Sequence, residues 1–139
     1  MALNGPLVSA VLVASLPLVA QAGPDLAQYR DKNRVLLIFA PSARDPRWQR
    51  QAALLRRSEA EFTDRELLRF DVFASGPKAD PALRARFHVK AGQFRVLLIG
   101  KDGHVAYGGP TPVPLAALTE TIDRMPMRRE EMRRKGKLG

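Results

Sequence analysis

The sequence predicts an α/β domain built from a mixed four-stranded sheet with helices on both faces. Three observations carry this prediction. A continuous apolar run at 35–39 is typical of a strand buried on both faces. Two Asp-Pro pairs, at 45–46 and 80–81, each predict a helix start with Asp as the N-cap and Pro in the first turn. The Gly-Lys-Asp-Gly stretch at 100–103 is typical of a tight hairpin between two strands.

The remaining elements follow from the spacing of apolar residues. A short helix is expected within 25–33, before the first strand. The helix expected to begin at Asp45-Pro46 has an apolar face made of Trp48, Ala52, Leu55 and Phe62. The other expected elements are a strand at 67–73, a short helix up to Phe87, strands at 94–99 and 104–107, and a terminal helix with Leu115, Leu118, Ile122 and Met125 on one face and Pro126 as its interruption.

This order of elements restricts the topology. Two strands joined through a long helix are expected to be parallel, with a right-handed crossover, and the final hairpin pair is antiparallel. The result is a three-layer fold, the architecture of thioredoxin. The length of the chain suits one such domain.

The first residues predict an export signal. None of residues 1–22 is charged, residues 7–20 form an apolar run, and Ala20-Gln21-Ala22 follows the small-x-small cleavage pattern. The alternative is a buried core helix. We predict a signal peptide at 1–22, a domain at 23–126 and a basic C-terminal tail at 127–139, with a periplasmic or secreted location. No later segment is long and apolar enough to span a membrane.

The chain contains no cysteine, which excludes thiol–disulfide oxidoreductase and thiol peroxidase activity. Thioredoxins carry their dithiol just after the first strand, where this chain has Pro41-Ser42-Ala43-Arg44. The proline that thioredoxins place in cis opposite the dithiol is also missing, because no proline lies between Pro81 and Pro110. We expect no cofactor, and any enzymatic activity would have to be non-redox.

Three stretches carry a resemblance to a known family: VLLIFAPS at 35–42, VLLIGKDG at 96–103 and IDRMPMRREEM at 122–132. On these, residues 26–134 resemble the DUDES-type thioredoxin-like domain, or domain of unknown function 4174, in a small secreted bacterial form. The resemblance implies a thioredoxin-like fold used without redox chemistry. No catalytic residue is established for the family, so none is transferred.

The loop after the first strand is one candidate binding site, formed by Ser42, Arg44 and Arg47. A helix N-terminus attracts anions, and the two arginines would add charge. The alternative, which we favour, is that Asp45 caps the helix and repels an anion. A serine nucleophile would need a base such as His88 or His104, and their spacing does not indicate one.

Neither the two histidines nor the glycine-rich stretch at 100–103 indicates a ligand site. His88 and His104 lack the spacing of a metal site, so we predict no bound metal. The stretch at 100–103 lacks the spacing of a phosphate-binding loop and favours a hairpin turn.

The C-terminal segment is the clearest positive signal. Residues 124–139 hold seven basic and two acidic residues and carry +5 of the chain's net charge of +9. Its basic residues are Arg124, Arg128, Arg129, Arg133, Arg134, Lys135 and Lys137. Such a cluster attracts polyanions. The alternative is a solvated, partly helical tail in which Glu130 pairs with Arg134.

The leading interpretation is an exported, non-redox binding module. Its partner is unknown; the chemistry suits an anionic envelope polymer, lipid head groups or a periplasmic protein, and no specific nucleic acid is expected. The alternative is a non-redox enzyme or an anion site on the loop after the first strand.

Overall fold

The computed structural model describes residues 24–136. The predicted signal peptide and Lys137 lie outside the described residues. Within the described part of the chain, no helix is both long and apolar enough to cross a membrane.

The four strands form one mixed sheet in the order β2-β1-β3-β4. Its strands are β1 (Arg34–Phe39), β2 (Leu67–Val72), β3 (Arg95–Ile99) and β4 (Val105–Gly109). The central strand β1 is parallel to β2 and antiparallel to β3, and β3 is antiparallel to β4. This topology confirms the predicted mixed sheet, with the crossover pair parallel and the hairpin pair antiparallel.

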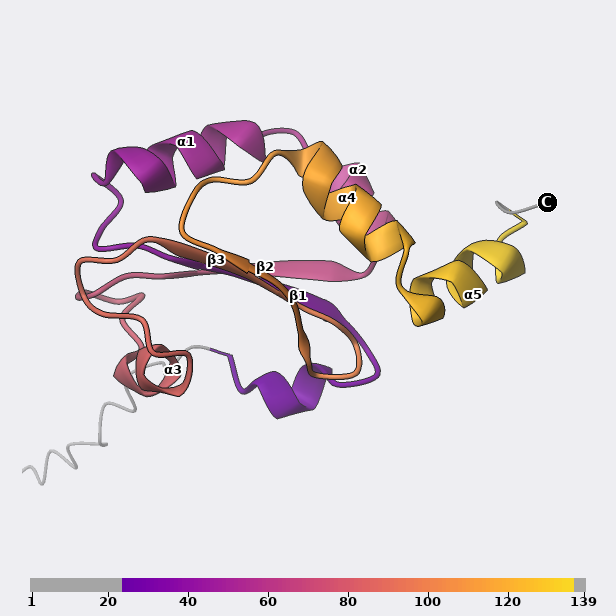
Figure 1. The fold of residues 1–139 in the computed structure, drawn as a ribbon, viewed down its shortest axis with the longest axis horizontal. Helices are drawn as coiled ribbons and strands as arrows, with labels where there is room; N and C mark the ends of the chain where they lie inside the picture. The colour runs from indigo at the N-terminus through magenta and orange to yellow at the C-terminus, as the bar shows by residue number, and fades with distance from the viewer. Residues whose placement is uncertain (1–23, 137–139) are drawn as a thin grey trace, which may run out of the picture.

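Helices cover both faces of the sheet (Figure 1). One face carries α1 (Pro46–Leu54), α2 (Glu59–Asp64) and α4 (Leu115–Asp123), and the other carries α3 (Pro81–Arg86) and the 3₁₀ helix η1 (Leu26–Tyr29). The three-layer arrangement is therefore confirmed. The last helix, α5 (Pro126–Arg134), extends past the end of α4 and belongs to neither layer.

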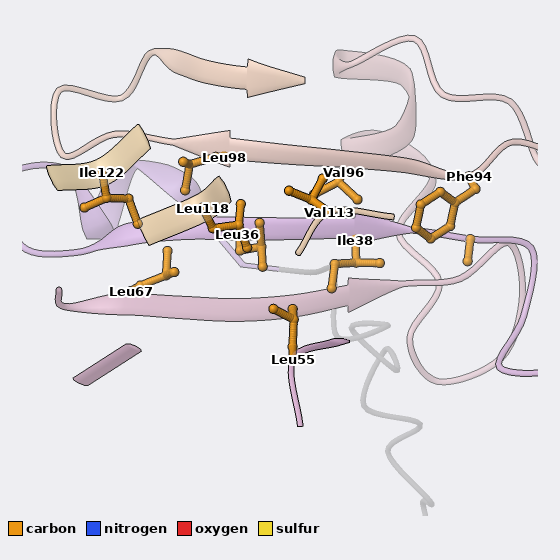
Figure 2. Packing of buried hydrophobic residues seen from close by; sticks show 11 residues of the cluster. Leu36, Ile38, Leu55, Leu67, Phe94, Val96, Leu98, Val113, Leu118 and Ile122 are labelled. Atoms are coloured by element: carbon orange, nitrogen blue, oxygen red, sulfur yellow. The ribbon is translucent and has the colours of Figure 1, made fainter. Parts of the chain in front are cut away.

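The apolar run of β1 explains why a core forms on each face. Successive side chains of a strand point to opposite faces. Leu36 and Ile38 join the cluster under α1 and α4, with Leu118 and Ile122 (Figure 2). The other side chains of the run, Val35, Leu37 and Phe39, belong to the second cluster, with Val72 and Leu83.

One predicted helix is divided in two. A single helix was expected through Phe62, but α1 ends at Leu54 and α2 begins at Glu59. Arg57 has a positive φ of 62° in the break, and the buried Ser58 hydroxyl donates a hydrogen bond to the Leu55 carbonyl at 2.5 Å. The left-handed conformation of Arg57 cannot continue a right-handed helix, so the chain is divided there into α1 and α2. Both helices contact the same face of the sheet.

The basic segment assigned to a separate tail begins as helix α5. Pro126 stands at the first position of this helix, where its fixed φ and missing N–H cost nothing. The segment up to Arg134 is helical and its contacts with the domain, described below, make it part of the fold.

Candidate functional site

The loop after β1 is organised by its own acid. The Asp45 carboxylate caps α1 by accepting the Arg47 N–H at 2.9 Å, and it also accepts two bonds from the Arg47 guanidinium at 3.0 and 2.8 Å. The side-chain hydrogen bond from Arg47 holds the pKa of Asp45 below its usual value. Ser42 Oγ accepts the backbone N–H of Arg44 at 3.2 Å. A carboxylate therefore already occupies the positive end of α1, as the capping alternative expects.

Neither histidine is hydrogen-bonded to Ser42 in the described part of the chain. His104 follows the turn after β3, beside the start of β1, whereas Ser42 follows the end of β1, and the two ends of a six-residue strand lie about 17 Å apart. His104 is 84% exposed, with its Nδ1 3.5 Å from Asp102 Oδ2. His88 lies after α3 and has no hydrogen bond to Ser42 among the bonds of the described chain.

A buried arginine joins the ends of β1 and β2, and sequence reasoning missed it. The Arg84 guanidinium is only 7% exposed and donates only to carbonyl groups. Its acceptors are Ala40 at 2.6 Å, Lys90 at 2.8 Å, Val72 at 3.3 Å and Phe73 at 3.4 Å. No carboxylate pairs with it among the described residues, and burial lowers its pKa. Arg84 thus fixes the start of the candidate loop.

A second buried cluster lies at the opposite end of β1 and holds α5. The Arg34 side chain is 0% exposed and donates two bonds of 3.2 Å to the Glu131 carboxylate, and a third of 2.8 Å to the Arg65 carbonyl. Lys101, at the hairpin after β3, donates to the same Glu131 at 2.6 Å. Burial alone would raise the pKa of Glu131, but the bonds from Arg34 and Lys101 outweigh it, and the pKa is lowered.

The cluster continues through Arg128, whose side chain is 1% exposed. Its guanidinium bonds Asp64 Oδ2 at 2.7 Å and Asp123 Oδ1 at 3.0 Å, and it lies 3.7 Å from Glu131. Arg65 donates to the same Asp123 at 3.0 and 2.9 Å. Burial opposes ionisation of Asp123, yet the bonds from Arg65 and Arg128 lower its pKa. We call Arg34, Lys101, Glu131, Arg128, Asp64, Asp123 and Arg65 the ion cluster.

The ion cluster changes the reading of the basic C-terminal residues. Arg128 was predicted to contact a polyanion, but its burial and its three acid partners give it a structural role instead. Arg133 and Arg134 both pair with Glu130, the latter at 3.4 Å with the expected i, i+4 spacing. Lys135 lies 3.6 Å from Asp64.

Two of the basic residues predicted at the C-terminus have no acid partner in the described part of the chain. Arg124 and Arg129 are exposed, and neither forms an ion pair among the described residues. They flank the start of α5 on either side of the buried Arg128.

The sequence carried one usable signal for the ion cluster. Arg34 stands directly before the apolar run, at a position that continues the buried strand. A charged residue there needs a buried partner. The partner could not be identified from spacing, because Glu131 lies 97 residues further along the chain.

No group of three or more histidine, aspartate or glutamate side chains within residues 24–136 is placed to hold a metal ion. The fold and the site together define a thioredoxin-like α/β domain in a chain whose 139 residues include no cysteine.

The chain belongs to the family described as "Domain of unknown function (DUF4174)", whose model matches residues 25–131. The match includes α5 up to Glu131 and therefore the acid that joins Arg34 to Lys101.

The fold is similar to that of a solved peroxiredoxin. The crystal structure of a reduced 2-Cys peroxiredoxin from Plasmodium vivax superposes with a TM-score of 0.61 at 14% sequence identity. The alignment covers 76% of this chain and 84% of the peroxiredoxin chain. At this identity the similarity shows the fold alone, which confirms the thioredoxin-like class.

Proposed function

We propose that this protein is an exported, non-redox binding module that contacts an anionic partner through two exposed cations, Arg129 in α5 and Arg124 two residues before this helix. One observation carries the proposal. Arg128 and Glu131 form ion pairs within the ion cluster and hold α5 in place, whereas Arg124 and Arg129 are exposed without an acid partner in the described chain.

The anchoring of α5 supports a role in display. The only fully buried residue of this helix is Arg128, so ion pairs and not an apolar stripe hold it to the domain. A helix held in this way presents its remaining cations at a fixed position, which lowers the entropy lost on binding a polyanion. Exposed cations of one sign also steer an anionic partner and raise its rate of association.

The loop after β1 is a weaker candidate for either an anion site or an enzyme. Its Arg47 is paired with Asp45, and Ser42 has no base beside it in the described residues. Nothing in its geometry favours a second function.

The binding proposal is tested with the Arg124→Gln/Arg129→Gln variant of residues 23–139, which include every described residue. Each cation near an anionic surface contributes about 1 kcal/mol, so roughly 30-fold weaker binding to anionic lipid vesicles is expected. Sedimentation binding to these vesicles, to lipopolysaccharide and to an anionic glycan across a salt series measures it.

The control for this test is Arg50→Gln/Arg56→Gln on and after α1, which removes two exposed arginines without ion pairs in the described part. Equal loss in both variants would show that only net charge matters and would contradict the proposal. Removing the whole segment from Arg124 is a poorer test, because it leaves Arg34 buried without Glu131.

Export is a separate prediction. Expressed from Met1 in a Gram-negative bacterial host, the protein is expected in the periplasm with Gly23 as its first residue, by intact mass and N-terminal sequencing. The matched variant Leu12→Arg interrupts the apolar run and should remain uncleaved in the cytoplasm. Uncleaved wild-type protein in the cytoplasm would contradict export and leave the binding proposal standing.

A further inference from the structure

A cavity of about 160 Å³ lies between the β3–β4 hairpin and the junction of α4 with α5. Its lining includes Val105, Ala106, Met125 and Met127 as apolar residues, with Arg34 and Lys101 from the ion cluster. The cavity therefore joins an apolar wall to two buried cations. Neither Arg124 nor Arg129 lines it, so it is distinct from the proposed polyanion surface.

The apolar wall contains an unusual exposure. Val105 and Met127 are the large apolar side chains that stay exposed in the described chain, at 48% and 42%. They come from separate elements, the edge strand β4 and helix α5, yet both line this cavity. Exposed apolar side chains gathered at a concave site are typical of a surface that binds an apolar group.

The cationic part carries an unmet hydrogen bond. Arg34 is fully buried, and its Nε–H has no acceptor among the described residues. Buried donors are almost always paired, and an unpaired one calls for a partner. Lys101 and Arg34 also share the carboxylate of Glu131, so positive charge exceeds negative charge between these three groups.

The remaining charges at the cavity do not cancel this excess. Glu66 lies 3.4 Å from Lys101 but is 47% exposed, and Asp102 on the rim is 64% exposed and lies beside His104. Charges in such solvated positions are strongly screened. The buried cations therefore dominate the field inside the cavity.

We propose that this cavity binds a small amphiphilic carboxylate, with its short apolar chain against Val105 and Met127 and its carboxylate toward Arg34 and Lys101. The terminal nitrogens of Arg34 already bond Glu131 and the Arg65 carbonyl, so the ligand carboxylate would accept from the Nε–H. The small volume suits a short free acid.

The test compares three probes with the same alkyl chain: octanoate, octanol and octylammonium, each below the concentration at which it aggregates. Calorimetry with residues 23–139 should show octanoate binding at least tenfold more tightly than the other two. The ¹⁵N resonance of Arg34 Nε should shift with octanoate and not with octanol. Equal affinities, or no binding, would overturn the proposal.

Substitutions separate the two halves of the site. Val105→Ser removes two methyl groups and Met127→Gln replaces a thioether and its methyl group by a polar amide, so each should weaken octanoate binding about tenfold. Met132→Gln, on the same helix but not in the lining, is the matched control and should change nothing. Lys101→Met should remove the preference for octanoate over octanol. Thermal unfolding of each variant shows that it folds.

Two further experiments test whether the bound carboxylate belongs to a free acid and whether the cavity acts independently of the polyanion surface. Arg124→Gln/Arg129→Gln should leave octanoate binding unchanged, so either proposal can fail alone. Phosphatidylglycerol vesicle binding that is lost in Val105→Ser and Met127→Gln, without octanoate binding, would assign the cavity to a lipid surface and overturn the free acid.

Discussion

Replacing Glu131 by glutamine is expected to lower the free energy of unfolding by about 3 kcal/mol, because it leaves buried cations without their anion. Arg34 is 0% exposed and directs two bonds at this carboxylate, and Lys101 directs a third. A neutral amide can accept a hydrogen bond but cannot offset either charge. The effect is large because both cationic partners are buried.

Urea unfolding measures this loss as a lower midpoint at an unchanged slope. The matched control is Glu130→Gln, one residue earlier in α5, which pairs with the exposed Arg133 and Arg134. Exposed pairs contribute little, so its cost should stay below about 1 kcal/mol. Equal losses from the two variants would contradict a dominant role for the ion cluster.

The same residue predicts how stability changes with pH. The pKa of Glu131 in the folded chain lies below the ordinary value of 4.5, and that of Asp123 lies below 3.8. Lowered carboxyl pKa values give stabilisation that is present above the unfolded pKa and is lost as the pH falls through the folded pKa. Wild-type stability should therefore fall as the pH drops below about 4.5, and Glu131→Gln should show a smaller fall.

Replacing Arg84 by alanine is the second large effect, with an expected loss of about 3 kcal/mol. Its guanidinium is bonded to four carbonyl groups at the ends of β1 and β2 and in the segment before β3. Hydrogen bonds from a charged donor contribute about 1.5–3 kcal/mol each, and the carbonyls of Ala40 and Lys90 would lose theirs. The alanine variant also no longer has to bury an unpaired charge, and this gain offsets part of the loss of hydrogen bonds.

Arg86→Ala is the control for Arg84, since it lies on the same helix and is exposed over the Phe87 ring. It should cost less than about 1 kcal/mol. Amide hydrogen exchange should also accelerate at residues 40–44 in Arg84→Ala, because Ala40 begins this loop. Unchanged exchange there, with a small loss of stability, would show that Arg84 does not fix the loop.

The sequence by itself determined the layers of this protein. The apolar run of β1 required burial on both faces, and both Asp-Pro pairs cap helices, as the bonds that the Arg47 and Leu83 N–H groups donate to Asp45 and Asp80 show. These features are local, because each depends on residues within one turn or one strand. They could be predicted without knowing what packs against them.

Only the tertiary structure decided which charges are buried and which are free. Arg128 and Arg129 are adjacent and chemically identical, yet one is buried between Asp64 and Asp123 and the other is exposed. The break between α1 and α2 could not be predicted either, because the helical pattern of apolar residues continues through it. Asp64, at the end of α2, bonds Arg128. Pairing of buried charges depends on where segments meet after folding, and Arg34 meets Glu131 across 97 residues of chain.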